Sequence, residues 1–176
     1  PAGHGPTISV VVPAHNEEPH IAEALDSVLA QTHTPLEIIV VDDGSTDGTA
    51  EAVRAVEDPR LRLIVQPSRQ GANAARNAGI EAARSSLLAF LDSDDVYLPH
   101  RLAWTAEKFR AEPDLNLVIS SFETIRGDRR SRSVNREGFV DAATLEKALV
   151  MQVIYIAGSA ITVRRASSIL TSCWRR

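Results

Sequence analysis

The chain has 176 residues, enough for one domain with a buried core and too few for two independent domains. Hydrophobic residues make up 44% and charged residues 24%, which are ordinary values for a soluble globular protein. The formal net charge of -4 gives no electrostatic reason to expect a nucleic acid partner, and the single cysteine excludes an internal disulfide framework and a cysteine metal cage.

The ends of the chain and its apolar runs bear on its location. No apolar run approaches the roughly 20 residues of a membrane span, and residues 1–6 lack the charged-then-apolar order of a signal peptide. We therefore expect a cytoplasmic protein without a transmembrane segment. Because the chain starts at Pro1 without a methionine, and stops at Arg176 without a helix-end or turn signal, we also expect a piece of a longer protein.

Short apolar runs alternate with helical patterns through the first part of the chain. The β-branched run Ile8–Val12, closed by Pro13, predicts a buried parallel strand that ends there, and apolar residues at helical spacing follow from Pro19. Three more strand and helix pairs are expected, at Ile38–Val41 with Gly48–Val56, Leu61–Val65 with Gly71–Arg84, and Leu87–Leu91 with a helix from Pro99. This alternation predicts a largely parallel sheet with helices on both faces.

The pattern is looser after residue 113. We expect a strand at Leu117–Ile119, a polar loop at Arg126–Glu137, a helix at Ala142–Met151 and a strand at Ile154–Val163. The arginines of the loop could contact phosphate or a membrane surface, although a solvated loop is the favoured interpretation. These arginines are Arg126, Arg129, Arg130, Arg132 and Arg136.

Polar side chains follow three of the expected strands. They belong to the segments Pro13–Glu18, Asp42–Ser45 and Asp92–Asp95. The carboxyl ends of parallel strands lie at one edge of a sheet, and carboxylates cannot be desolvated unpaired within it. We therefore expect these segments to face one crevice.

Two alternate carboxylates, Asp92 and Asp94, suit a hard divalent cation. Mg²⁺ or Mn²⁺ prefers oxygen ligands and leaves room for phosphate oxygens, so one or two carboxylates suffice. A lone Asp-x-Asp is more often a solvated turn. Its position after a buried strand favours the metal interpretation here.

Other polar residues of these segments have both a structural and a functional interpretation. Asp43 could accept a hydrogen bond from a nucleobase N–H, although alone it is better explained as a turn and helix-cap residue. Arg76 could approach a nucleotide or could be an exposed helix charge. Glu17 and Glu18 suit the first turn of a helix, and His15 alone would be a surface histidine.

Several enzyme classes lack their motifs. There is no Gly-x-Gly-x-x-Gly after the first strand and no Gly-Lys-Ser/Thr phosphate loop, which argues against dinucleotide and P-loop sites. A Gly-x-Ser-x-Gly elbow and a histidine-rich cluster are also absent from the sequence. The remaining interpretation is an acidic, metal-compatible crevice for a nucleotide.

Four segments in order resemble glycosyltransferase family 2. They are Pro13–Glu18, Val41–Thr49, Gly71–Gly79 and Phe90–Asp95, and Gly158–Arg165 resembles a later segment of the family. The resemblance implies an α/β protein with the GT-A fold, a Rossmann-like three-layer α/β/α sandwich with a mostly parallel central sheet and a truncated C-terminal part. Residues 1–176 would be a single domain, with a donor-binding half at about 7–101 and an incomplete acceptor-side half at about 102–176.

The resemblance also implies an activity. The protein would be a metal-dependent inverting transferase of polysaccharide biosynthesis, with Mn²⁺ or Mg²⁺ as cofactor, at the inner face of the membrane or free in the cytoplasm. It would move a sugar from a nucleotide-diphosphate donor, commonly a uridine one, to a saccharide, lipid-linked or protein acceptor. The implied nucleotide-sugar-binding residues are Pro13, Ala14, His15, Glu17, Asp43, Arg76, Asp92 and Ser93, and the implied metal ligands are Asp94 and Asp92.

Two departures from the family pattern leave alternatives open. The position of His15 is usually aromatic in the family, so stacking on the base would be altered. The family's Glu-Asp pair, whose aspartate deprotonates the acceptor, has no match in this chain, so we identify no catalytic residue and expect the general base beyond Arg176. A catalytically silent nucleotide-sugar-binding module and a nucleotidyltransferase are the alternatives.

Overall fold

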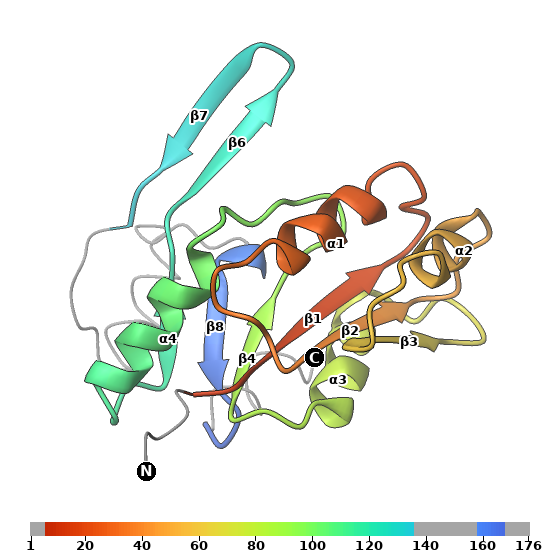
Figure 1. Ribbon diagram of the computed structural model, residues 1–176. Coiled ribbons are helices and arrows are strands. Elements are labelled where there is room, and N and C mark those ends of the chain that lie inside the picture. The colour runs from red at the N-terminus through yellow and green to blue at the C-terminus, as the bar shows by residue number, and fades with distance from the viewer. Residues whose placement is uncertain (1–5, 136–157, 168–176) are drawn as a thin grey trace.

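The computed structural model describes residues 6–135 and 158–167, and their central feature is a six-stranded sheet. The sheet consists of β1 (Ile8–Ala14), β2 (Glu37–Asp42), β3 (Leu61–Val65), β4 (Leu87–Phe90), β5 (Leu117–Ile119) and β8 (Ile161–Arg164). The helices are α1 (Ile21–Leu29), α2 (Thr49–Arg54), α3 (Ala72–Ala82) and α4 (Arg101–Ala111). Figure 1 shows the helices surrounding the sheet.

The strand order in the sheet is β3-β2-β1-β4-β8-β5. The pairs β1–β2, β2–β3 and β1–β4 are parallel, whereas β8 is antiparallel to both β4 and β5. The four strand and helix units predicted from the sequence are confirmed, and so is the mostly parallel α/β sheet. The carboxyl ends of β1, β2 and β4 therefore lie at the same edge.

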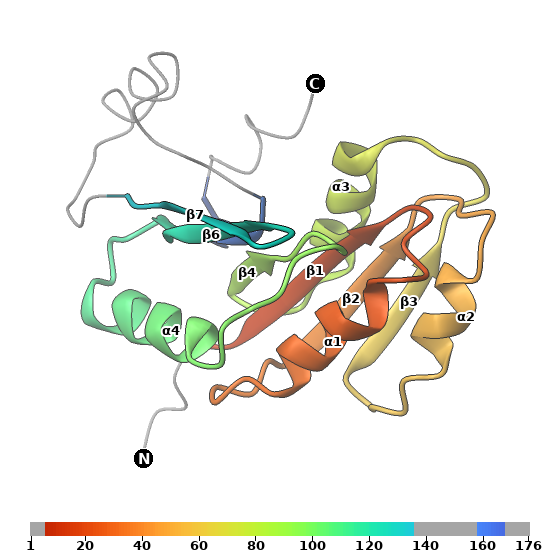
Figure 2. The same ribbon diagram turned by 90° about the horizontal axis from the view of Figure 1, so that it is seen from above.

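Apolar side chains alternate between the two faces of the sheet. Val10 and Val12 of β1 belong to the core beneath α1, α2 and α4, while Val11 belongs to the core beneath α3. Figure 2 shows α3 on the opposite side of the sheet from the other three helices. Both faces are covered, which explains why the parallel strands are continuously apolar.

The first strand is longer than predicted. We expected it to end at Pro13, but β1 continues to Ala14, and Pro13 is in register with Val41 of β2. Proline lacks the N–H that a ladder requires, so it is tolerated only where no partner needs that donor. The pairing of β1 with β4 ends at Val11 and Phe90, so Pro13 lies beyond it.

The predicted polar loop at Arg126–Glu137 is wrong. Strands β6 (Phe122–Arg126) and β7 (Arg129–Ser133) pair as an antiparallel hairpin that projects away from the sheet (Figure 1). Gly127 at the turn has a φ of 56°, which glycine adopts without strain. The hairpin residues are mostly polar on both sides, so the alternating pattern that indicates a half-buried strand is absent.

The C-terminal predictions are only partly covered by the structure. A 3-10 turn, η1 (Gly158–Ala160), precedes β8, so the strand predicted at Ile154–Val163 begins at Ile161 among the described residues. The helix predicted at Ala142–Met151 lies outside them. Within residues 6–135 and 158–167, no helix has the length and apolar character needed to cross a membrane.

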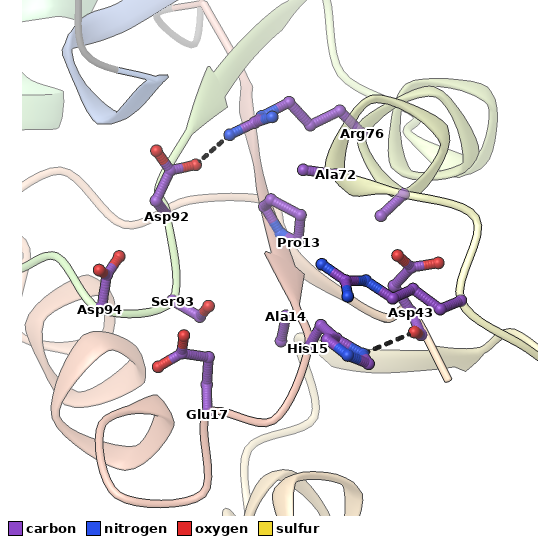
Figure 3. A pocket seen from close by; sticks show the side chains of 12 residues that line it. Pro13, Ala14, His15, Glu17, Asp43, Ala72, Arg76, Asp92, Ser93 and Asp94 are labelled. Atoms are coloured by element: carbon purple, nitrogen blue, oxygen red, sulfur yellow. Dashed lines mark hydrogen bonds and ion pairs between the residues drawn. The ribbon is translucent and has the colours of Figure 1, made fainter. Parts of the chain in front are cut away.

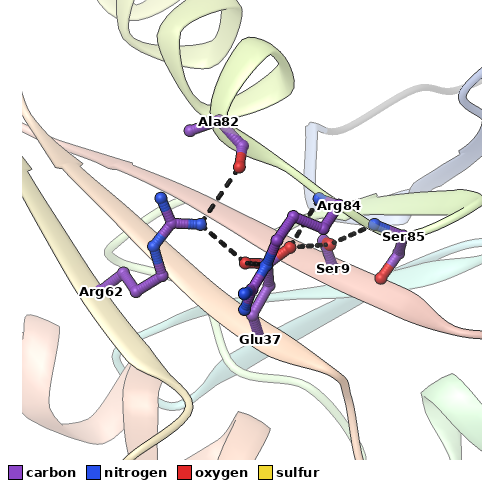
Figure 4. Close-up of polar contacts among 6 residues, drawn as sticks. All are labelled: Ser9, Glu37, Arg62, Ala82, Arg84 and Ser85. Carbon is purple, nitrogen blue, oxygen red and sulfur yellow. Dashed lines mark hydrogen bonds and ion pairs between the residues drawn. The ribbon is translucent and has the colours of Figure 1, made fainter.

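A buried carboxylate, Glu37, lies at the amino edge of the sheet, where β2 begins (Figure 4). It accepts hydrogen bonds from Ser9 Oγ at 2.8 Å, from Arg62 Nη1 at 2.8 Å, and from the backbone N–H and Nε of Arg84 at 2.7 and 3.0 Å. Burial acts to raise the pKa of Glu37, but these hydrogen bonds outweigh it and hold the pKa below its ordinary value.

Candidate functional site

A cavity of about 240 Å³ opens at the carboxyl edge of the sheet. The nine residues predicted to bind donor or metal all line it, namely Pro13, Ala14, His15, Glu17, Asp43, Arg76, Asp92, Ser93 and Asp94. Figure 3 shows Asp43 and His15 on one side of β1 and Asp92, Ser93 and Asp94 on the other. Acidic turns far apart in the sequence thus share one cavity.

The loop after β1 turns sharply at Asn16, which has a φ of 57°. Asparagine adopts this left-handed conformation more readily than most residues. Asn16 Oδ1 accepts the backbone N–H of Thr46 at 2.8 Å, and its own N–H donates to Ser45 Oγ at 3.0 Å. His15 Nδ1 donates to the backbone oxygen of Asp43 at 2.9 Å (Figure 3). The loops after β1 and β2 therefore hold each other in place.

The two glutamates of the first loop have different positions. Glu17 lines the cavity, and its backbone N–H donates to Thr49 Oγ1 at 2.8 Å. Glu18 accepts the backbone N–H of Gly48 at 3.0 Å, at the start of α2. The structural interpretation placed both glutamates in the first turn of the following helix, but α1 begins only at Ile21. The negative charge of Glu18 lies instead at the N-terminal end of α2, where it is favourable.

Asp43 is buried, with 2% of its surface exposed, and its carboxylate anchors the loop between β3 and α3. Oδ1 accepts the N–H of Gln70 at 2.6 Å and Oδ2 accepts that of Gly71 at 2.7 Å. Gly44, with a φ of 65°, lets the two loops touch, since a Cβ there would lie 2.6 Å from the carbonyl carbon of Ser68. A carboxylate has about four acceptor positions, so Asp43 retains capacity for a ligand.

Arg76 and Asp92 form an ion pair across the cavity (Figure 3). The exposed fractions of their side chains are 12% and 29%, so Arg76 is not the exposed helix charge of the alternative interpretation. Ala72 lies one turn before Arg76 on α3, and the small side chains of Ala72 and Ala75 also line the cavity. The ion pair connects α3 to the end of β4, in a partly desolvated place where charge-assisted hydrogen bonds are strong.

The turn Asp92–Asp95 closes through a hydrogen bond from the N–H of Asp95 to the backbone oxygen of Asp92 at 3.0 Å. Asp94 within it is exposed and forms no hydrogen bond or ion pair with the described part of the chain. Burial raises the pKa of Asp95, the hydrogen bond from Ser159 opposes this, and the charges of Asp94 and Asp92 add to the increase. Because Asp94 is exposed and has no partner among the described residues, its carboxylate is available for a ligand.

The oxygen donors at the site fit a divalent cation whose other ligands are phosphate oxygens of a bound nucleotide and water. Within residues 6–135 and 158–167, no group of three or more histidine, cysteine, aspartate or glutamate side chains is arranged to hold a metal ion. Asp94 and the second oxygen of Asp92 remain as oxygen donors. Mg²⁺ is commonly bound by one or two carboxylates together with phosphate oxygens and water, which matches this donor set.

Three cavity residues were not predicted from the sequence. They are Arg69, Ala72 and Ala75. Arg69 lies in the loop after β3, and the rule that ligand sites lie at the carboxyl ends of parallel strands could have indicated it. The alanines precede Arg76 by four residues and one residue, so the face of α3 that carries Arg76 could have indicated Ala72.

Comparisons with known proteins identify the family and the fold of the chain. The family model described as "Glycosyl transferase family 2" matches residues 9–169. The succinoglycan biosynthesis protein ExoO of Rhizobium meliloti is 40% identical over 126 residues, which are 72% of this chain and 36% of ExoO. The chain thus spans less than half the length of this relative.

Two solved structures have the same fold. A mannosyltransferase, PcManGT from Pyrobaculum calidifontis, in complex with GDP-Man and Mn²⁺, has a TM-score of 0.60 and 32% identity, covering 67% of this chain and 36% of that one. TarS of S. aureus in complex with UDP-GlcNAc has a TM-score of 0.70 and 25% identity, covering 94% of this chain and 46% of that one.

Proposed function

The chain belongs to glycosyl transferase family 2, and we propose that its cavity binds the donor in an inverting, metal-dependent transfer of sugar to a hydroxyl acceptor. The observation that carries the proposal is that Asp43 and Asp94 line the same cavity. Asp43 offers hydrogen-bond acceptors for a base at one side, and Asp94 offers oxygen ligands for a cation at the other. A nucleotide diphosphate has its base and its cation-binding phosphates at opposite ends.

The size of the cavity limits what it encloses. Its volume of about 240 Å³ is a little below the roughly 300 Å³ at which small-molecule sites usually begin. We therefore propose that the cavity holds the nucleoside and part of the diphosphate. The sugar would extend past Asp94 toward the acceptor-side half, which we place at about residues 102–176.

In this proposal Asp94 and Asp92 would hold Mn²⁺ or Mg²⁺ together with the phosphate oxygens of the donor. The bound cation would neutralise the charge that grows on the departing diphosphate. Arg76 holds the Asp92 carboxylate in place through their ion pair. Interactions that strengthen as the leaving group departs accelerate the reaction, whereas uniform binding does not.

The acceptor hydroxyl needs a base within hydrogen-bond reach. The proposal uses Asp43, Asp92 and Asp94 for the donor and its cation, so the base has to come from another part of the protein. The acceptor would be a saccharide, a lipid-linked sugar or a protein hydroxyl.

The donor base is proposed to be uracil. An acceptor such as Asp43 suits the N3–H of uracil, but it also suits the N1–H of guanine, and PcManGT is in complex with GDP-Man. The size of the two bases separates the options. We expect a small cavity between β1 and α3 to favour the pyrimidine.

Calorimetric titration tests donor binding. We expect UDP-sugars to bind more tightly in Mn²⁺ than in EDTA, and GDP-mannose to bind more weakly than UDP-GlcNAc. A transfer assay with UDP-sugars and saccharide acceptors then separates catalysis from silent binding. Release of pyrophosphate from nucleoside triphosphates, without sugar transfer, would instead identify a nucleotidyltransferase.

Peripheral membrane association is also proposed, on the evidence of the β6–β7 hairpin. Arg126, Arg129, Arg130 and Arg132 are exposed on it and form no ion pair within the described ranges. Basic side chains attract anionic lipid. Sedimentation with vesicles of phosphatidylglycerol should carry the protein down, and vesicles of phosphatidylcholine should not.

A further inference from the structure

The turn η1 lies against the acidic turn Asp92–Asp95, although the two are far apart in the sequence. Ser159 Oγ accepts the backbone N–H of Asp92 at 2.9 Å and donates to Asp95 Oδ2 at 2.5 Å. A hydroxyl has one proton to donate and lone pairs to accept, so both bonds can form together. One side chain therefore holds the first and the last residue of the acidic turn.

Gly158, the neighbour of Ser159, lies directly on the ion pair of the cavity. A Cβ at this position would lie 2.6 Å from Asp92 Oδ2 and 3.1 Å from Arg76 Nη2. The first distance is shorter than real Cβ contacts allow, so a side chain would force the carboxylate of Asp92 to move. Glycine at this position permits the close approach of η1 to the site.

The position of η1 is fixed by the sheet. It leads into β8, which pairs with both β4 and β5, and the backbone oxygen of Ala160 accepts the N–H of Ser120 at 2.9 Å. Asp94, in contrast, has no hydrogen bond of its own to the described part of the chain. The direction of its carboxylate therefore depends on how well the turn around it is held.

From these contacts we propose that Ser159 is a positioning residue that sets the Asp92–Asp95 turn so that Asp94 faces the donor cavity. Ser159 acts through the turn and touches neither donor nor cation. Its effect on donor affinity rests on the proposed function, whereas its effect on the turn does not.

The first test measures the turn without any donor. Replacing Ser159 by alanine removes the acceptor of the Asp92 N–H and also the hydroxyl that donates to the Asp95 carboxylate. Hydrogen exchange at the Asp92 amide should therefore become at least about tenfold faster. Ser159→Thr keeps the hydroxyl and should restore protection. The matched control is Ser120→Ala, because the buried hydroxyl of Ser120 has no partner among the described residues.

The second test measures donor affinity in Mn²⁺ and in EDTA by calorimetry. In Mn²⁺, the donor affinity of Ser159→Ala should be about five- to tenfold lower than that of wild type. In EDTA its affinity should stay within about twofold of wild type, because Ser159 contacts the backbone N–H of Asp92 and neither Asp43 nor the ion pair of the Asp92 carboxylate with Arg76. Ser159→Thr should bind like wild type in both. A loss that is equal with and without Mn²⁺ would point to general destabilisation and overturn the positioning role.

Gly158→Ala provides a variant that acts from the adjacent position. Its Cβ displaces Asp92 and with it the contact to Arg76, so donor affinity should fall both in Mn²⁺ and in EDTA.

If Ser159→Ala does not fold, Ser159→Cys keeps a side chain of similar size with a weak hydrogen-bonding group, and the same two measurements apply to it.

The outcomes separate this inference from the proposed function. Unchanged exchange at the Asp92 amide in Ser159→Ala overturns the inference and leaves the function standing. Faster exchange with unchanged affinity in Mn²⁺ also overturns it. If the wild-type protein binds no nucleotide sugar at all, the proposed function fails together with the role of Ser159 in donor binding.

Discussion

Two groups of carboxylates at opposite edges of one sheet are organised differently. At the amino edge, Glu37 is fully buried and accepts four hydrogen bonds from the chain itself. At the carboxyl edge, Asp94 is exposed and receives none from the described residues. A carboxylate that the protein satisfies internally is suited to stability, and one that it leaves available is suited to a ligand.

Asp43 and Asp92 combine features of both groups. Each has internal partners, the N–H groups of Gln70 and Gly71 for Asp43 and Arg76 for Asp92, and each also lines the cavity. We therefore expect variants at the two edges to separate stability from binding, with these two residues affecting both.

The largest effect is expected for Glu37→Ala. The change leaves Ser9 Oγ and the N–H of Arg84 without their acceptor, and it should lower the free energy of unfolding by about 3 kcal/mol. The figure is below the full value for a buried ion pair because the side chains of Arg62 and Arg84 are 41% and 66% exposed. Urea unfolding measures the change.

The matched control is Glu51→Ala, which removes an exposed pair with Arg54 and should cost less than about 1 kcal/mol. Nucleotide-sugar affinity of folded Glu37→Ala should equal that of wild type. A large loss of affinity without a loss of stability would contradict the division between the two edges.

Asp94→Ala is expected to have the opposite profile. Donor affinity in Mn²⁺ should fall at least about tenfold, to the level measured in EDTA, since even outer-shell partners of a metal commonly contribute 10- to 100-fold. Stability should stay within about 0.5 kcal/mol, because the side chain that is lost is exposed and has no partner among the described residues. Calorimetry in both buffers makes the comparison, and equal affinities of mutant and wild type in Mn²⁺ would refute the ligand role.

Asp43→Asn should moderately reduce both the stability of the fold and the affinity for the donor. The amide NH₂ group replaces one acceptor, so one of the N–H groups of Gln70 and Gly71 loses its partner, at a cost of about 1 to 2 kcal/mol. Affinity should fall equally in Mn²⁺ and in EDTA, since the cation is not involved. Asp26→Asn, on the exposed side of α1, is the control and should change neither quantity.

The smallest effect is the dependence of stability on pH through Glu37. Its pKa in the folded protein lies below the ordinary value of 4.5, so its contribution is complete above that pH and is lost as the pH falls through the folded pKa. Urea unfolding from neutral to acidic pH should show a shallower acid decline in Glu37→Gln than in wild type. Identical slopes would mean that other groups cause the decline.

Much of the fold and of the site could be predicted from the spacing of the apolar residues and from the acidic residues that follow the strands. Apolar runs identified the four parallel strands, and the rule for strand ends brought Asp43 and Asp94 to one edge. The β6–β7 hairpin was missed because it buries neither face, so its backbone pairing left no apolar signal. The contacts of Gly158 and Ser159 were missed because they depend on β8 inserting between β4 and β5, which no local pattern specifies.

The central claim is that the cavity holds base and diphosphate between Asp43 and Asp94. A crystal structure of the protein soaked with a UDP-sugar and Mn²⁺ tests it most directly. We expect the uracil beside Asp43, the diphosphate between Arg76 and Asp94, and the cation on Asp94. A nucleotide bound on another surface, or a cation away from the Asp92–Asp95 turn, would contradict the account.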